Sequence, residues 1–190
     1  MLFRVAQAGL VRAKWTEEIL DEMFRNLKNN RPDLDADKLD VMRAKMRTSV
    51  RDWRVAGYEP IVASLELPDP GDRHVLAAAI RAKAQCIVTA NLRDFPREAL
   101  EPWNVEAVHP DDFLEARISE APETVYGIIE KISNLCRRPP LSTADVIETL
   151  AKTQMPNSVE ALRRLDVRIV RQVDRVSVPG RQNPPGDPGV

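Results

Sequence analysis

The chain has 190 residues, 43% of them hydrophobic, which is enough for one globular domain of ordinary size and a smaller additional unit. Its 28 Lys and Arg balance 29 Asp and Glu, so the composition lacks the basic excess of a tight nucleic-acid binder, and any RNA contact must be local. Cys86 and Cys136 lie too far apart for a disulfide framework or a metal-ligand motif, and the sequence has neither a signal-peptide pattern nor an apolar stretch of membrane-spanning length. We therefore expect a cytoplasmic protein without membrane contact.

Two helices are predicted in the first quarter of the chain. Thr16, followed by two glutamates, has the pattern of a helix N-cap, and the helix is expected from about residue 17 to 29. Asp35 is expected to cap a second helix over about 36–50. Apolar residues recur at helical spacing in both segments, which predicts one buried face for each helix. These faces consist of Ile19, Leu20, Met23, Phe24 and Leu27, and of Leu39, Met42, Met46 and Val50.

Strands are predicted at four places, and one helix stands out between them. Short strands are expected at 9–15 and within 53–58. A helix over 72–84 is followed by a β-rich strand at 86–90, and a further strand is expected at 105–108. Alternation of this kind is typical of a doubly wound α/β sheet, which here gives a three-layer arrangement of parallel character. The core stripe of the helix is predicted to be Val75, Leu76, Ala79 and Ile80.

The pattern changes after the motif H109-P-D-D-F-L114 and becomes entirely helical. Three helices without intervening strand signals are expected at 122–136, 143–154 and 157–175. Because the end of the chain is rich in proline and glycine, we expect it to be disordered. The predicted organisation is an α/β domain, a helical extension and a disordered tail, at residues 1–115, 116–176 and 177–190.

The lengths of the central helix and strand predict where the acidic side chains gather. The helix over 72–84 spans about 20 Å and the strand over 86–90 about 17 Å, and the tight connection makes them antiparallel. Asp72 is therefore expected at the same edge as Asn91 and Asp94, outside the carboxyl end of the strand, where open α/β sheets bind ligands. Carboxylate oxygens converging there suit a hard divalent cation such as Mg²⁺ or Mn²⁺.

Three segments in this order resemble the PIN-domain nucleases, especially the toxin components of bacterial toxin–antitoxin pairs. They are T16-E-E-I-L-D-E22, D72-R-H-V-L-A-A-A and V88-T-A-N91-L-R-D94-F-P, and the resemblance covers about 1–114. It implies a ribonuclease in which carboxylate-bound Mg²⁺ or Mn²⁺ activates water to hydrolyse RNA, with an antitoxin protein as partner. Glu22, Asp72 and Asp94 then match the catalytic, metal-binding acids, and Thr89 and Asn91 match the supporting polar residues.

Two departures from the family pattern lower the expected activity. Family members begin with a strand that ends in an aspartate and continues into a helix, whereas the first ten residues here resemble the end of that helix. Either the start was assigned too late or the gene is a truncated remnant, and the strand at 86–90 would then have an unpaired side. Asn91 also replaces an aspartate found in many relatives. With two charges fewer at the site, we expect little or no cleavage by this chain as written.

Each acid also has a purely structural interpretation. Asp72 has the residue type of an N-cap, Glu22 belongs to an acidic helix that is typical of a solvated face, and Asp94 has the residue type of a turn former. His74 and His109 are both interpreted as structural, since neither has a nucleophile at motif spacing.

Two other functions compete with the nuclease. The stronger is a non-catalytic, degenerate PIN module that binds an antitoxin, another partner or a second copy of the chain. DNA binding through the C-terminal helices is weaker, because no recognition-helix pattern is evident.

Overall fold

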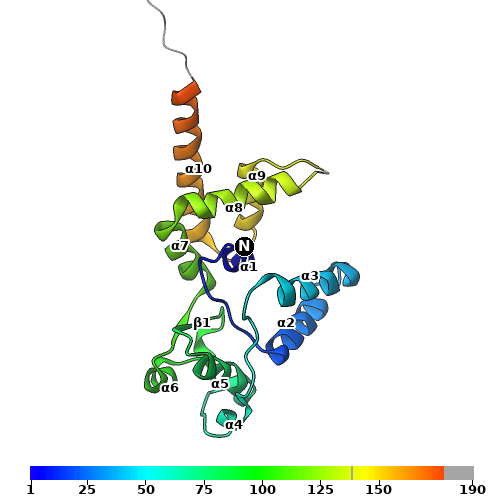
Figure 1. Ribbon diagram of the computed structural model, residues 1–190, viewed down its shortest axis with the longest axis vertical. Coiled ribbons are helices and arrows are strands. Elements are labelled where there is room, and N and C mark those ends of the chain that lie inside the picture. Colours follow the sequence, from blue (N-terminus) through cyan, green and yellow to red (C-terminus); the bar gives the residue numbers. More distant parts are fainter. Residues whose placement is uncertain (138, 178–190) are drawn as a thin grey trace, which may run out of the picture.

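A computed structural model describes residues 1–137 and 139–177, and the predicted disordered tail at 177–190 lies outside these ranges except for Ser177. The helices α7, α8, α9 and α10 gather at one end of the molecule together with the N-terminal α1, and the strands lie toward the other end (Figure 1). The helices of the first group are α1 (Leu2–Gln7), α7 (Pro110–Glu120), α8 (Pro122–Leu135), α9 (Thr143–Ala151) and α10 (Pro156–Ser177). In the described part of the chain, no helix is both long and apolar enough to cross a membrane.

The sheet is parallel, as the sequence predicts, but it has only two strands among the described residues. β1 (Cys86–Val88) pairs with β2 (Glu106–Val108) in the register Cys86 to Glu106, and the amide of Thr89 extends the ladder by donating to Val108 at 3.0 Å. Among the described residues, β1 pairs with β2 alone. The α/β class with a helical C-terminal region is therefore confirmed. The elements around the sheet are α4 (Glu59–Val62), η1 (Pro70–Asp72), α5 (Arg73–Ala82), η2 (Leu92–Asp94), α6 (Arg97–Leu100) and η3 (Glu101–Trp103).

The core beneath the sheet comes mainly from α5. Leu76 and Ala77 are completely buried, because α5 packs one face on β1 and the segment around α4. The predicted stripe is confirmed for Leu76 and Ala79, whereas Val75 and Ile80 are only partly buried. The other buried residues of this cluster are Val55, Tyr58, Leu65, Leu67, Ala78, Ala79, Ile87, Phe95, Leu100 and Val105.

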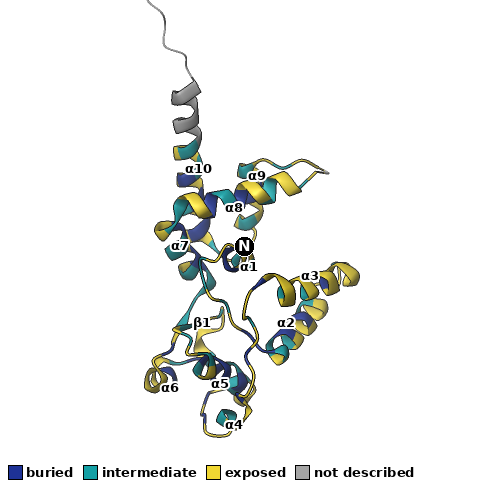
Figure 2. Cartoon of the chain, in the orientation of Figure 1, coloured by how far each residue is buried: buried dark blue, intermediate teal, exposed yellow. Residues whose placement is uncertain are grey.

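Both predicted helices of the first quarter are present with their predicted caps. The amide of Ile19 donates to the hydroxyl of Thr16 at 3.0 Å at the start of α2 (Glu17–Asn30). Asp35 accepts from the amides of Asp37 and Lys38 at the start of α3 (Ala36–Ser49). The predicted inward faces are too wide, since Met23 and Met42 are exposed. Figure 2 shows that α3 is largely exposed. The two helices share only a small buried cluster with the segments around Trp15 and Trp53.

The strands predicted at 9–15 and 53–58 are wrong. Each segment contributes one residue to an isolated parallel bridge between Trp15 and Arg54, and the backbone around it is irregular. The amide of Trp15 donates to Trp53 and that of Val55 to Trp15, both at 2.9 Å. The two indole rings stack with centroids 5.7 Å apart. Ring stacking and two hydrogen bonds hold these segments together without forming a regular ladder.

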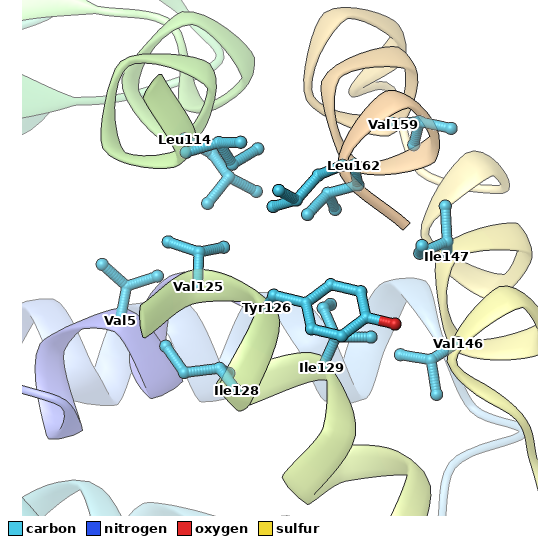
Figure 3. Close-up of a cluster of buried hydrophobic side chains, with 12 residues drawn as sticks. Val5, Leu114, Val125, Tyr126, Ile128, Ile129, Val146, Ile147, Val159 and Leu162 are labelled. Atoms are coloured by element: carbon cyan, nitrogen blue, oxygen red, sulfur yellow. The ribbon is translucent and has the colours of Figure 1, made fainter. Parts of the chain in front are cut away.

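The C-terminal helices share one hydrophobic cluster with α1. Their bounds match the three predicted helices closely, and α7 is an additional helix that runs across the predicted boundary at residue 115. Val5 of α1 lies beside Val125 and Ile128 of α8 in this cluster (Figure 3), so the helical lobe, formed by α1 and α7 to α10, contains residues from both parts of the sequence. The buried members are Val5, Leu114, Ile118, Val125, Tyr126, Ile128, Ile129, Val146, Ile147, Val159, Leu162 and Leu165.

A buried carboxylate joins α7 to α10. Asp111 is only 3% exposed, and its two carboxylate oxygens accept from the amides of Asn157 at 2.9 Å and Ser158 at 2.8 Å. The Ser158 hydroxyl in turn donates to the carbonyl of Asp111 at 2.9 Å. These amides belong to the first turn of α10, which lacks intrahelical partners for its N–H groups. A residue of one helix therefore caps another.

Candidate active site

Asp72 is held at the start of α5 without capping it. Its backbone ends η1 with φ −83° and ψ −6°, and its side chain makes no capping hydrogen bond. The cap of η1 is Asp69, whose carboxylate accepts from the amide of Gly71 at 2.7 Å. Asp72 therefore occupies the N-cap position of α5 without the side-chain hydrogen bond that an N-cap usually makes. The carboxylate is left available for another role.

The surroundings of Asp72 disfavour its negative charge. Partial burial raises the pKa of Asp72 above its ordinary value, and the charges of Asp69, Asp94 and Glu22 raise it further, while His74 acts in the opposite direction. Three other carboxylates thus act electrostatically on the same group. A carboxylate in such a setting gains most from a nearby cation.

Asp94 ends η2, just beyond β1, and is held by its neighbours. The amide nitrogen of the Asn91 side chain donates to one carboxylate oxygen, and Nε of Arg93 lies 3.7 Å from the other. Arg93 also donates to Oδ1 of Asn91 at 3.0 Å, and the hydroxyl of Thr89 accepts from the amide of Asn91 at 3.1 Å. The predicted supporting residues therefore shape the loop that carries Asp94.

Glu22 reaches the site from α2 through a histidine of α5. Its Oε2 lies 3.3 Å from Nε2 of His74, which follows Asp72 by two residues. Glu18, one turn earlier on α2, places its Oε2 3.6 Å from Nδ1 of the same ring. The hydroxyl of Tyr58 donates to Glu18 at 2.8 Å. Glu22 consequently faces α5 and contacts a buried ring, so it is more than a member of a solvated acidic face.

The three predicted acids share one region but do not form a closed metal cage. Glu22 and Asp94 both influence the ionisation of Asp72. Among the residues that the structure describes, no three His, Cys, Asp or Glu side chains lie close enough to hold one metal ion. The assignment of Glu22, Asp72 and Asp94 as metal ligands therefore remains a prediction.

The sequence interpretation missed the role of His74, although helical spacing contains a signal for it. His74 precedes the buried Ala77 and Ala78 by three and four residues, which places it on the inward face of α5. The other histidine, His109, is structural as predicted, because its Nδ1 accepts from the amide of Asp111 at 3.2 Å and caps α7. Cys86 is partly buried at the start of β1, and burial raises the pKa of its thiol, which agrees with core filling.

Comparisons with known proteins divide the chain into two matched segments. Residues 1–93 match the family model described as a PIN domain, and residues 110–164 match the model described as the VapC50 C-terminal domain. Asp94 lies one residue beyond the first match. A protein of Mycobacterium tuberculosis named "Putative ribonuclease VapC50" is 37% identical over 109 residues, which cover 57% of this chain and 63% of that protein. No solved structure matches the chain. Residues 1–93 are thus similar to a PIN domain, and the segment after them is similar to the VapC50 C-terminal domain.

Proposed function

We propose that the chain is a PIN-type ribonuclease that hydrolyses RNA phosphodiesters with the help of a divalent cation. The observation that carries the proposal is the state of Asp72, whose partly buried carboxylate caps nothing and is repelled by Asp69, Asp94 and Glu22. Concentrated negative charge of this kind is costly in free energy unless a cation offsets it. Ionisable groups in such surroundings are often found at active sites. The resemblance to a protein named as a ribonuclease supports the same conclusion.

The residues present fit Mg²⁺ or Mn²⁺. All the candidate donors are oxygens, from Glu22, Asp72, Asp94 and the side-chain carbonyl of Asn91, and hard cations prefer oxygen ligands. Mg²⁺ usually keeps several waters and needs only one or two carboxylates, so a cage of three protein ligands is not required. When bound, the cation supplies an activated water and stabilises charge on the phosphodiester.

The side chains have separate tasks in this proposal. Asp72 and Glu22 would hold the cation from two different helices, and Asp94 would add a third negative charge from the loop after β1. Asn91 and Thr89 fix that loop through their hydrogen bonds. Arg93 lies at the rim with a side chain that is 87% exposed, where it can approach an RNA phosphate. Arg93 would supply the local basic contact that RNA binding requires in a chain whose charges balance.

Cleavage of a labelled RNA by the purified chain tests the proposal. Because Asn91 leaves the site short of charge, we expect weak cleavage at most. Any cleavage should need Mg²⁺ or Mn²⁺, stop with EDTA and be lost in Asp72→Asn, which removes a charged ligand at constant size. Asp112→Asn is the matched control, because Asp112 is an exposed acid in the helical lobe. Cleavage that persists in EDTA or in Asp72→Asn contradicts the metal–carboxylate mechanism.

A second candidate is a non-catalytic PIN module that binds an antitoxin or a second copy of the chain. The observation that favours it is the engagement of Asp94 by Asn91 and Arg93, together with the lack of a three-residue metal group in the described ranges. A folded chain that cleaves no RNA with either cation, yet forms a stable complex with an antitoxin encoded beside it, would support this candidate over the nuclease.

A further inference from the structure

His74 is a buried polar side chain between two acids. The residue is 9% exposed, and its Nδ1 has no hydrogen-bond partner among the described residues. A buried polar ring costs free energy unless polar groups lie beside its nitrogens. The ring reaches from α5 toward Glu18 and Glu22 of α2.

The two acids differ in what else holds them. Glu18 receives a hydrogen bond of 2.8 Å from the hydroxyl of Tyr58, so its carboxylate has a partner besides the histidine. For Glu22, the described contact is Nε2 of His74 at 3.3 Å. The histidine is therefore more important for the placement of Glu22 than for that of Glu18.

Charge repulsion opposes the placement of the Glu22 carboxylate beside Asp72. Glu22 and Asp72 are both carboxylates, and like charges repel each other. The imidazole of His74 lies beside Glu22 and is close in sequence to Asp72. A flexible glutamate in the middle of α2 would turn away from the site into solvent. The ring of His74, which α5 holds two residues after Asp72, would keep Glu22 beside Asp72.

We propose that His74 is a positioning residue whose Nε2 holds the Glu22 carboxylate beside Asp72, so that both acids face the divalent cation together. The inference rests on the proposed function and names the group that assembles its site. It assigns no direct contact between His74 and the cation. Partners of this kind orient the ligands of metal sites, and their loss typically lowers metal affinity about 10- to 100-fold.

Binding of Mn²⁺ to the full chain, measured by titration calorimetry, tests the inference without an activity assay. An amide side chain places its nitrogen near Nε2 of a histidine in His74→Gln and near Nδ1 in His74→Asn. We expect His74→Gln to bind Mn²⁺ nearly as the wild type does. His74→Asn should lose at least about tenfold in affinity. Tyr58→Phe, which removes only the bond to Glu18, should bind normally.

His74→Leu provides a second variant that loses the contact, since an apolar side chain suits the buried position. It should bind Mn²⁺ as weakly as His74→Asn. Circular dichroism and the melting temperature show which variants are folded. In a Glu22→Gln background the carboxylate beside Nε2 of His74 is gone, so His74→Leu should cause little further loss of Mn²⁺ affinity.

The outcomes separate the inference from the proposed function. If Asp72→Asn weakens binding while folded His74→Leu and His74→Asn bind like the wild type, the positioning role is wrong and the cation site stands. If His74→Gln binds as poorly as His74→Asn, the contact through Nε2 is wrong. If the wild type binds no Mn²⁺, or binds it equally well in Asp72→Asn, both the site and the inference are overturned.

Discussion

The link between α7 and α10 provides the sharpest test of how the helical lobe is held together. Asp111→Ala removes the acceptor of two N–H groups, those of Asn157 and Ser158. Loss of a helix cap costs about 0.5–2 kcal/mol, and a buried donor left without a partner costs about 1–3 kcal/mol. Since Ser158 is 1% exposed, water cannot readily replace the carboxylate there. We expect the free energy of unfolding to fall by about 3 kcal/mol.

Urea and thermal unfolding, followed by circular dichroism, measure this change. For a chain of this size, about 3 kcal/mol corresponds to a melting temperature lower by about 6–12 °C. Asp112→Ala changes the next residue of the same helix, where the side chain is exposed, and should have little effect. An Asp111→Ala protein as stable as the Asp112→Ala control would show that Asp111 does not cap α10.

The ionisation of Asp111 should make the stability of the protein depend on pH. Burial by itself would raise the pKa of Asp111, but hydrogen bonds from Ser158 and Asn157 outweigh it and the pKa is lowered. A carboxyl group with a lowered pKa in the folded state stabilises the protein above its unfolded pKa, and this contribution is lost as pH falls through the folded value. The stability difference between wild type and Asp111→Ala should therefore be constant near neutral pH and shrink below about pH 4.

Two further predictions concern stability elsewhere in the chain. Thr16→Ala removes the cap of α2 and should lower the free energy of unfolding by about 1 kcal/mol in urea unfolding, whereas Thr48→Ala, an exposed change in α3, should not. Ile129→Ala creates a cavity in the helical lobe and should cost about 2–5 kcal/mol, while Leu135→Ala, at a position that is 64% exposed, serves as its control. Equal stability within either pair would show that the assigned cap or core contact is wrong.

Local signals in the sequence were sufficient for α2, α3, α8 and α9, though not for α7. Thr16 and Asp35 act through residues two or three positions away, so their capping roles can be recognised without any tertiary structure. The bounds of α8 and α9 follow from apolar periodicity for the same reason. Asp72 was singled out by its place before α5 and by family spacing, and both are properties of short segments.

Contacts between distant segments could not be predicted in this way. Asp111 caps a helix that begins more than forty positions later, and the pair is separated by 46 residues in one of its hydrogen bonds. His74 gains its meaning only from Glu22, which belongs to a different helix. The stacked Trp15 and Trp53 likewise pair across the chain, where β propensity predicted strands instead. In each case the structure is determined by a contact between distant segments, whereas patterns in a single sequence report only local preferences.

The position of α1 has a consequence for folding during synthesis. Val5 is completely buried in a cluster whose other members begin at Leu114 and extend to α10. The ribosome makes α1 well before α7 to α10, and the cluster is completed only when α10 has emerged. At synthesis rates of about 5–20 residues per second, α1 must wait roughly ten to thirty seconds for its partners. During that interval it presents unburied apolar side chains, so the nascent chain should be a better chaperone client than the finished protein.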